Sequence, residues 1–431
     1  MIPILILITL LACQEPEDAE PRNLTLKILD IEPTYVTFSL QIKDLPRPAL
    51  IVMTRDGFWS QTVRVFGTDT VLHDQWDLEP KKSYTWQAHE TNGQDYTHSS
   101  NVVSGTTGDT TSHAFTFSLT ELGPSASFVN DVWIVNENNI WVAGEFHDFS
   151  KPDTLYNVLH WDGTTWNKHR LIFHLEYANP DYDLNIFGEA AGVYVTNSGR
   201  VWVVGENSGI SYTDDWGKKW SVIYGLRNMA MTANKIWGYG GPEFHVAGYA
   251  GGVLYFNGTR FFRLRKTTDL DMVDLWGNSE GVFVIAGNFD FNIQPPIVKV
   301  QETSLELFPN KIEGLANYQR GIWVTEKHKY LANGSLFRYD KHRKMWFSVH
   351  TGSAGVDAGA ITVRGNSDFD YWIGNGFNLA HFNGGTFKVY PEVYNLGAGR
   401  MTFHRLAVKE GLLVAVGFAN NRDYLVMGRR K

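Results

Sequence analysis

One pattern recurs along most of the chain: a large apolar residue is followed eleven positions later by glycine. It is clearest in the four segments VWIVNENNIWVAG (132–144), VYVTNSGRVWVVG (193–205), IWGYGGPEFHVAG (236–248) and LWGNSEGVFVIAG (275–287). It continues in three further pairs, Trp323 with Gly334, Val363 with Gly374, and Leu406 with Gly417. The glycines are 39 to 61 residues apart, which is typical of the four-stranded blades of a β-propeller. Residues 113–431 are therefore predicted to form a seven-bladed β-propeller in an all-β protein.

An aromatic hairpin is repeated within these units, as LHWDGTTW (159–166), YFNGTRF (255–261) and HFNGGTF (381–387). We expect Asp162 and Gly163 to adopt the positive φ angles of a tight turn. Trp161 and Trp166 are expected to fill the wedge between neighbouring blades.

A variant of this hairpin, SYTDDWGKKW (211–220), has the composition of a known turn element. Its Thr213, Asp215, Gly217 and Trp220 resemble the Asp-box of sialidase-like propellers, which forms turns and takes no part in catalysis. The tryptophans of the chain are accordingly interpreted as mostly core residues.

The seventh unit, from Arg405, has length for only three strands before the chain ends. The segment AFTFSLTEL (114–122) precedes the first unit and alternates apolar with polar residues. We predict that it supplies the missing outer strand, because joining the first and last segments in one blade closes the ring and removes exposed sheet edges.

Residues 23–110 have the pattern of a separate β-sandwich. LTLKILDI (24–31) and YVTFSLQI (35–42) alternate with period two, and RDG (55–57) indicates a hairpin between two further strands. Leu78, Pro80 and Tyr84 match the Leu-x-Pro-x-x-x-Tyr pattern of fibronectin type III domains, in which the tyrosine hydroxyl bonds back to the backbone. The unit is predicted to be a fibronectin type III-like spacer.

The N-terminus, MIPILILITLLAC (1–13), resembles a bacterial lipoprotein signal peptide that ends in a lipobox cysteine, Cys13. Such a peptide is cut before the cysteine, which then carries several acyl chains and anchors the protein to a membrane. Residues 14–22 (QEPEDAEPR) are acidic and proline-rich, as expected of an unfolded tether. The alternatives are a signal peptide with an incidental cysteine and a misassigned start.

The whole arrangement resembles a family of bacterial lipoproteins from the Ignavibacteria and Bacteroidetes group, with a fibronectin-like module and a propeller. The resemblance rests on SHAFTF (112–117), DVWIVNENNIWVAGEF (131–146), YNVLHWDGTTWNKHRL (156–171) and NKIWG (234–238). It implies an exported protein at the outer membrane or surface of a Gram-negative bacterium. Members often carry the label "glucosyl transferase", so a carbohydrate-active enzyme, either a transferase or a glycosidase, stays an alternative function.

The residues favour no catalytic centre. A net charge of −8 without a basic patch argues against nucleic acid as a partner. The 14 histidines have no metal-binding spacing, and no nucleophile elbow or phosphate-binding loop occurs, so no catalytic residue, cofactor or metal is predicted. Two Asp-x-Asp motifs, DLD (269–271) and DFD (368–370), are interpreted as solvated turn aspartates. Arg320, Arg364 and Arg405 near the inner strands are too few to indicate a sialidase site.

Loop lengths favour a binding surface instead. Three long connections that share one end of the propeller, 145–156, 172–190 and 288–296, are rich in aromatic residues and carboxylates, which suit sugar rings or a peptide. The predicted ligand residues are Asp148, Phe149, Tyr177, Asp181, Tyr182, Asp290 and Phe291. The alternative is that these aromatics only hold the loops in place. The sequence thus predicts a monomeric, lipid-anchored, non-catalytic envelope protein that binds a glycan or a protein partner, or serves as the scaffold of an envelope complex.

Overall fold

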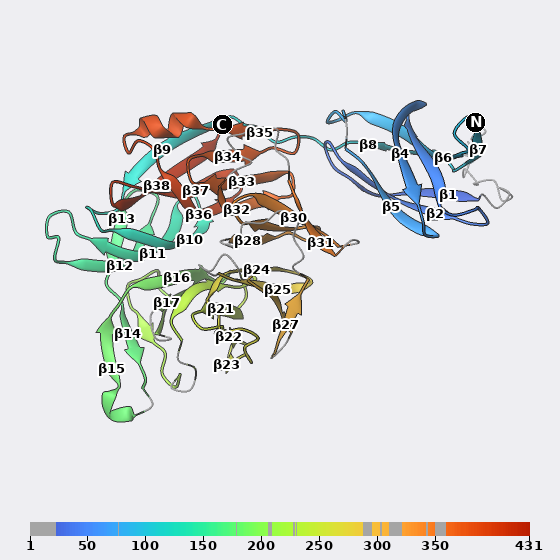
Figure 1. Ribbon diagram of the computed structural model, residues 1–431. Coiled ribbons are helices and arrows are strands. Elements are labelled where there is room, and N and C mark those ends of the chain that lie inside the picture. The colour runs from blue at the N-terminus through green and yellow to red at the C-terminus, as the bar shows by residue number, and fades with distance from the viewer. Residues whose placement is uncertain are drawn as a thin grey trace, which may run out of the picture. The chain divides into compact units, whose positions relative to one another are not determined.

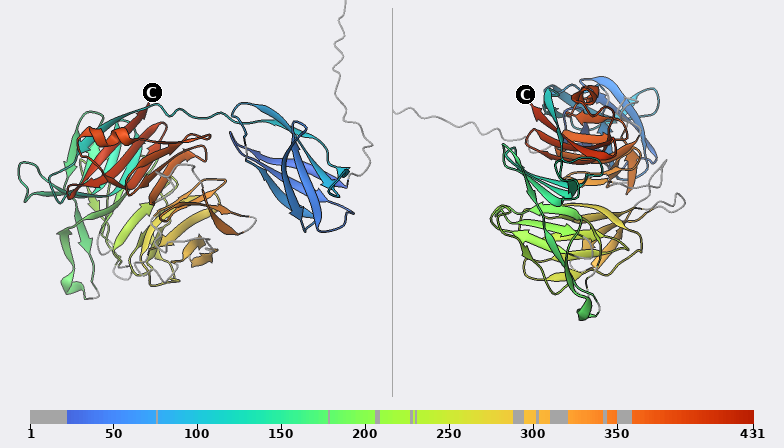
Figure 2. Two further views of the ribbon diagram at one scale, coloured as in Figure 1. Left: turned by 45° about the horizontal axis from the view of Figure 1, so that its top comes forward. Right: turned by 90° about the vertical axis from the view of Figure 1, so that its left-hand side faces the viewer.

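The computed structural model describes residues 23–75, 77–177, 179–205, 209–226, 229, 231–287, 295–301, 304–309, 321–341, 344–349 and 359–431. The chain divides into two compact units, Met1–Thr110 and Thr111–Lys431. Both units consist of antiparallel β-sheets (Figures 1 and 2). Among the described residues, no helix has the length and hydrophobicity that a membrane crossing requires.

The first unit contains two sheets that share one core. Its strands are β1 (Leu24–Ile31), β2 (Val36–Ile42), β3 (Ala49–Arg55), β4 (Phe58–Val65), β5 (Asp69–Asp74), β6 (Ser83–Thr91), β7 (Tyr96–Ser99) and β8 (Val103–Thr106). One sheet has the order β1-β2-β5, and the other has the order β4-β3-β6-β7, with β8 also paired to β6. Leu26 and Phe38 of the first sheet pack with Ile51 and Trp86 of the second in a single buried cluster, so the two sheets face each other.

Tyr84 makes the bond that the sequence predicts for it. Its ring is buried at the start of β6, and its hydroxyl accepts a hydrogen bond from the Glu79 backbone N–H at 2.9 Å. Glu79 lies in the connection from β5, so this bond ties the connection to the strand that follows it.

The second unit contains seven four-stranded sheets among its described residues, and we call them blades 1 to 7 in chain order. Strands are given from the innermost outward: blade 1 has β10 (Phe128–Asn136), β11 (Asn139–His147), β12 (Leu155–Trp161) and β13 (Trp166–His169), and blade 2 has β16 (Ala190–Val195), β17 (Val201–Gly205), β18 (Ile210–Thr213) and β19 (Ser221–Val222). Blade 3 has β20 (Ala233–Trp237), β21 (Phe244–Gly248), β22 (Val253–Phe256) and β23 (Phe261–Arg263), blade 4 has β24 (Met272–Asn278), β25 (Gly281–Ala286), β26 (Ile297–Gln301) and β27 (Ser304–Phe308), and blade 5 has β28 (Gly321–Val324), β29 (Lys329–Ala332), β30 (Leu336–Asp340) and β31 (Met345–Ser348). Blade 6 has β32 (Ala360–Ser367), β33 (Asp370–Asn375), β34 (Leu379–Phe382) and β35 (Phe387–Val389), and blade 7 has β36 (Thr402–Lys409), β37 (Leu412–Ala419), β38 (Arg422–Arg430) and β9 (Phe115–Glu121). Each innermost strand lies beside those of the two neighbouring blades, so the sheets form a ring, which is the β-propeller fold.

The ring is closed as the sequence predicts. β9 pairs with β38 over seven residues, from Phe115 opposite Arg430 to Glu121 opposite Tyr424. Lys431, the last residue, donates its backbone N–H to Ala114 at 2.8 Å. The first and last segments of the unit therefore share blade 7, and β38 leaves no free edge at the end of the chain.

The repeated glycines are explained by a bulge in the innermost strand. In blades 1, 2 and 3 one extra residue bulges after Val129, Ala190 and Ala233, and the glycine of the next strand lies opposite each of them. A Cβ atom at Gly144, Gly205 or Gly248 would collide with the carbonyl oxygen of the residue that precedes its partner, which is Phe128, Glu189 or Thr232, respectively. Only glycine fits this close backbone approach, so the repeat marks a bulge that every one of these blades needs.

The aromatic hairpins share a turn that differs in one respect from the prediction. Gly163, Gly258 and Gly384 have φ angles of 94°, 89° and 94°, but Asp162 is not in the left-handed region. The Asp162 carboxylate instead accepts hydrogen bonds from the backbone N–H groups of Thr164 and Thr165 at 2.9 and 2.8 Å. Asn257 and Asn383 make the same two bonds in their turns, so the acidic or amide side chain caps the turn.

The propeller has two different ends. At the turn end lie the short connections between first and second strands: 137–138, 196–200, 238–243, 279–280, 325–328, 368–369 and 410–411. At the loop end lie the connections between second and third strands and those between blades, which include η4 (Pro391–Leu396). Between blades 1 and 2 the chain forms a hairpin, β14 (Ile172–Leu175) and β15 (Leu184–Phe187), with η1 (Pro180–Tyr182) at its tip. Figures 1 and 2 show this hairpin projecting from the ring.

Candidate functional site

Two buried ion pairs lie on the innermost strands around the centre of the propeller. Asp131 of blade 1 accepts a hydrogen bond from the Val193 backbone N–H of blade 2 at 3.1 Å and pairs with the Lys235 ammonium of blade 3. Asp274 of blade 4 repeats this arrangement. It accepts from the Ile322 N–H of blade 5 at 3.0 Å and binds the Arg364 guanidinium of blade 6 at 2.9 and 3.0 Å. We call these four side chains the channel floor.

The bulges place the channel floor. Asp131, Lys235 and Asp274 are each the first paired residue after the bulge in their strand. In the blades between the partners the corresponding position is glycine, so no side chain stands there. Gly192 follows the bulge of blade 2, and Gly321, the first paired residue of β28 in blade 5, lies two residues before Trp323 as Asp274 lies two before Trp276. Each aspartate therefore reaches past the next blade to a cation on the blade after it.

Burial makes the channel floor sensitive to any unpaired charge. Lys235 and Arg364 are 8% and 6% exposed. Burial lowers the pKa of Lys235 and the nearby Arg364 also disfavours its charge, whereas Asp131 and Asp274 oppose both effects. The Arg364 guanidinium also lies 4.5 Å from the centroid of the Trp276 ring. Loss of one partner would leave a buried, uncompensated charge.

Above the channel floor, at the turn end, lies a pocket of about 620 Å³. Its aromatic lining residues are Trp133, Trp216, Trp237, Tyr239 and Trp276, and its basic lining residues are Lys235, Arg364 and Lys409. The turns of blades 2 and 3 form one wall and are joined by a hydrogen bond from the Asn197 N–H to the Gly240 carbonyl at 2.6 Å. The pocket thus combines flat apolar faces with positive charge and backbone polar groups.

Trp216 stands out among these residues because its backbone is strained. Its φ angle is 58°, in the left-handed region that residues other than glycine and asparagine rarely adopt. The residue is 41% exposed, so burial of its ring does not fully account for this conformation. Its ring lies over Gly199, where a Cβ atom would be 3.1 Å from the ring. An exposed indole on strained backbone at a pocket rim points to a functional role. The Asp-box interpretation did not single it out, because Trp216 is the variable residue between Asp215 and Gly217.

The pocket has the chemistry of a binding site. Of the described residues that line it, none is Asp, Glu, His or Cys. The lining does include Lys235, Lys409 and Tyr239, and lysine and tyrosine are residue types that can also transfer protons or act as nucleophiles. Two of its basic side chains, Lys235 and Arg364, are already paired with Asp131 and Asp274, whereas Lys409 donates to the Val135 carbonyl, pairs with no described carboxylate and favours a ligand that carries negative charge.

At the loop end, the structure separates the predicted ligand residues into two groups. Asp148 lies in the β11–β12 loop, where it accepts hydrogen bonds from Ser150 and Lys168, and these bonds lower its pKa. It therefore stabilises its own loop, on which Phe149 is 53% exposed. Tyr177, Asp181 and Tyr182 lie on the projecting hairpin, away from that loop in Figures 1 and 2. Asp290, Phe291 and Cys13 lie outside the described residues.

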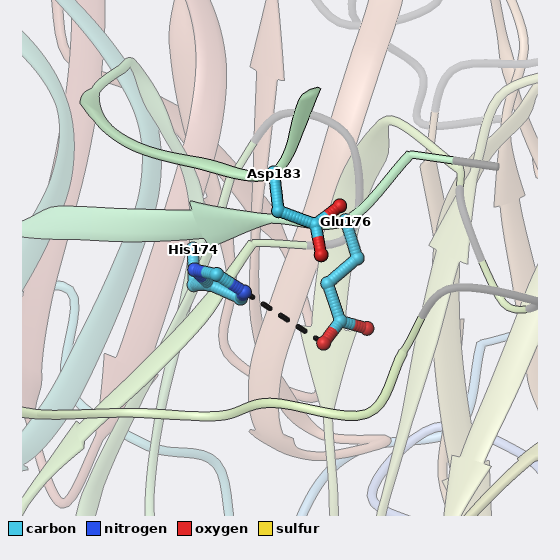
Figure 3. Close-up of side chains that lie close together, drawn as sticks. All are labelled: His174, Glu176 and Asp183. Atoms are coloured by element: carbon cyan, nitrogen blue, oxygen red, sulfur yellow. Dashed lines mark ion pairs between the residues drawn. The ribbon is translucent and has the colours of Figure 1, made fainter. Parts of the chain in front are cut away.

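The hairpin itself corrects one expectation. Residues 172–190 were expected to form an irregular loop, but β14 and β15 pair in register from Ile172 opposite Phe187 to Leu175 opposite Leu184. On one face the hairpin brings together His174, Glu176 and Asp183, a group whose ligand atoms lie within 4.8 Å of one another (Figure 3). The sequence signal, His-x-Glu with Asp seven residues later, becomes visible only when the hairpin register is known.

The second Asp-x-Asp motif is also not what the sequence suggests. Asp368 and Asp370 are buried, at 8% and 5% exposure, and are not solvated turn residues. Asp368 accepts hydrogen bonds from Thr325 and Tyr330, and burial raises its pKa. Asp370 binds His381 and Arg430, whose hydrogen bonds outweigh burial and lower its pKa. Both aspartates therefore hold neighbouring strands together.

No known protein-family model matches the chain, and no curated protein matches its sequence. Solved structures do resemble it. A structure of YCF48 bound to D1 peptide has a TM-score of 0.54 at 14% identity, over 74% of this chain and 96% of that chain. YCF48 from Cyanidioschyzon merolae has a TM-score of 0.49 at 13% identity, over 74% and 98%. The extracellular domain of the hybrid two-component system BT3049 from B. thetaiotaomicron has a TM-score of 0.50 at 12% identity, over 72% and 42%. At these identities the likeness shows the propeller fold alone.

Proposed function

We propose that the protein is a non-catalytic binding module whose turn-end pocket takes a peptide segment of a protein partner, one with a carboxylate beside apolar or aromatic side chains. The observation that carries the proposal is the lining of the pocket, with five aromatic and three basic side chains and no acidic one among its described residues. Aromatic faces stack on apolar groups, while the Lys409 ammonium, which pairs with no described carboxylate, attracts the carboxylate of the ligand. A propeller with a similar fold has been solved with a peptide bound, which is compatible with this role.

The test is a peptide array probed with the purified full-length protein, followed by titration of each hit by fluorescence anisotropy. Wild type is expected to prefer acidic peptides with aromatic residues, and Trp216→Ala to weaken binding about tenfold or more. Tyr224→Ala is the matched control, because Tyr224 is an exposed aromatic residue, at 63%, in a loop-end connection. A glycan array run in parallel covers the alternative ligand class. Glycan binding that Trp216→Ala leaves intact, with no peptide hit, would contradict the proposal.

We further propose that residues 23–110 are a fibronectin type III-like spacer between the propeller and a membrane. The two facing sheets and the bond between Tyr84 and Glu79 support this assignment. Acylation of Cys13, with 14–22 as the tether, would anchor a monomeric protein to the envelope of a Gram-negative bacterium. Labelled palmitate should enter the wild-type protein in cells and not Cys13→Ala. Equal labelling of both would reject the lipid anchor without bearing on the pocket.

A further inference from the structure

The hairpin β14–β15 gathers metal-binding side chains on one face. His174 lies in β14 and Glu176 directly follows the last residue of that strand, so the extended backbone turns both side chains to the same side. The ladder pairs Leu175 with Leu184, which places Asp183 directly opposite Glu176 when the register is continued. Figure 3 shows the three side chains turned toward one another, and their ligand atoms lie within 4.8 Å of one another.

The His174 ring is already oriented for binding an ion. Its Nδ1 atom lies 2.9 Å from Oδ1 of Asn185, the residue opposite it in the ladder. A proton shared there leaves Nε2 with a free lone pair, and Nε2 lies 3.7 Å from Oε1 of Glu176. Metal-binding histidines characteristically donate their other ring N–H to an oxygen in this way. The Tyr224 ring, 4.3 Å from the His174 ring, limits its movement.

Glu176 supplies an independent indication of a missing ligand. Its Oε1 atom accepts a hydrogen bond from the Gly225 N–H at 2.8 Å. Its Oε2 atom is shielded from solvent and has no hydrogen-bond partner, and the side chain is only 11% exposed. A buried carboxylate oxygen without a partner is costly, and a cation between Glu176, His174 and Asp183 would remove that cost.

We infer that His174, Glu176 and Asp183 bind a divalent transition-metal ion of the zinc class. One imidazole and two carboxylates are suitable Zn²⁺ ligands, whereas Ca²⁺ and Mg²⁺ prefer an all-oxygen set. Bond lengths of about 2.0–2.2 Å place tetrahedral ligand atoms about 3.4 Å apart, so the three ligand atoms, which lie within 4.8 Å of one another, have to move closer together when the ion binds. Because Glu176 also binds the 224–225 segment, the ion fixes the hairpin to the blade 2 connection. This site shares no residue with the proposed peptide pocket.

The test is a Zn²⁺ titration of full-length, tag-free protein that has first been treated with a chelator. Binding is followed by competition with a chromophoric chelator. Wild type should bind one ion per chain at this site. His174→Gln and Glu176→Gln should each lower the affinity more than about 100-fold, which exceeds the loss expected for an outer-shell partner. Co²⁺ in place of Zn²⁺ should give visible absorption bands that both variants lose.

The matched control is His147→Gln. His147 also faces a glutamate, since its Nε2 atom lies 3.9 Å from Oε1 of Glu145, but this pair belongs to no group of three metal-binding side chains among the described residues. It should leave Zn²⁺ binding unchanged. Asn185→Ala, which keeps all three ligands, should lower the affinity about tenfold and so tests the site without removing a ligand.

Three outcomes would overturn the assignment. These are no Zn²⁺ binding by the wild type, equal binding by wild type and the His174 and Glu176 variants, and Ca²⁺ binding that His174→Gln does not affect. Circular dichroism of each variant checks the fold. Hydrogen–deuterium exchange of the 172–187 amides should slow when Zn²⁺ is added to wild type, but not when it is added to His174→Gln.

Discussion

The two ends of the propeller differ: one surrounds a pocket, and the other carries most of the exposed aromatic residues. At the turn end, connections of two to six residues surround a pocket whose floor is two buried ion pairs. The loop-end connections carry most of the exposed aromatic residues described in this unit, among them Phe149, Tyr182, Tyr224 and Phe377. The contrast teaches that length and aromatic content of loops indicate accessible surface, whereas a pocket arises where inner strands converge.

The largest effect is expected at the channel floor. Asp274→Ala would leave the Arg364 guanidinium buried without its carboxylate and the Ile322 N–H without its acceptor. The free energy of unfolding should fall by about 3–5 kcal/mol, as measured by urea denaturation. Asp148→Ala removes an ion pair at the loop end and should cost far less, because water replaces the lost bonds. Similar losses in both variants would mean that the buried ion pair of the channel floor stabilises the fold no more than the ion pair at the loop end.

The second effect is a loss of stability in acid that originates at the turn end. Burial lowers the pKa of His245 and His160 to about 4 and the pKa of His328 to about 3. An unfolded histidine titrates near pH 6.5, so between these values the unfolded chain binds more protons than the folded one. Each of these histidines therefore contributes stability that is complete above about pH 7 and declines as the pH falls toward 4, by about 2 kcal/mol per histidine at pH 5.

Thermal unfolding at pH 7.5 and pH 5 measures this dependence. His245→Gln removes one of the groups and should make the difference in Tm between the two pH values smaller. An unchanged difference would assign the acid sensitivity to other groups.

The sequence predicts the architecture because each blade repeats a local signal. Gly144, Gly205 and Gly248 mark bulges that depend on a few neighbouring atoms, and AFTFSLTEL (114–122) is the strand that the seventh unit lacks. The pocket is not predictable in this way, since it depends on which side chains from six blades meet at one axis. Arg364 illustrates the difference: it is an isolated arginine in the sequence but a partner of Asp274, ninety positions away, in the fold.

The third effect separates binding from stability at Trp216. Trp216→Asn replaces an indole in the left-handed region with a residue that tolerates this conformation, so the free energy of unfolding should stay equal or rise by up to about 1 kcal/mol. Peptide affinity should nevertheless fall. A variant that is both less stable and weaker in binding would indicate that Trp216 is a packing residue, whose ring stabilises the fold by stacking on the His160 ring. Urea denaturation and fluorescence anisotropy on the same sample distinguish these outcomes.

The smallest effect is expected at the loop end. Phe149, Tyr177 and Tyr182 are 53%, 40% and 66% exposed, so changing all three to alanine removes little packing and should alter the free energy of unfolding by less than about 0.5 kcal/mol per residue. Peptide binding at the turn end should be unchanged, because no residue of this triple variant lines the pocket. If the triple variant loses ligand binding while Trp216→Asn keeps it, the exposed aromatic residues are the recognition surface and the pocket is not. Because the two variants alter opposite ends of one rigid ring, either result assigns binding to a single end.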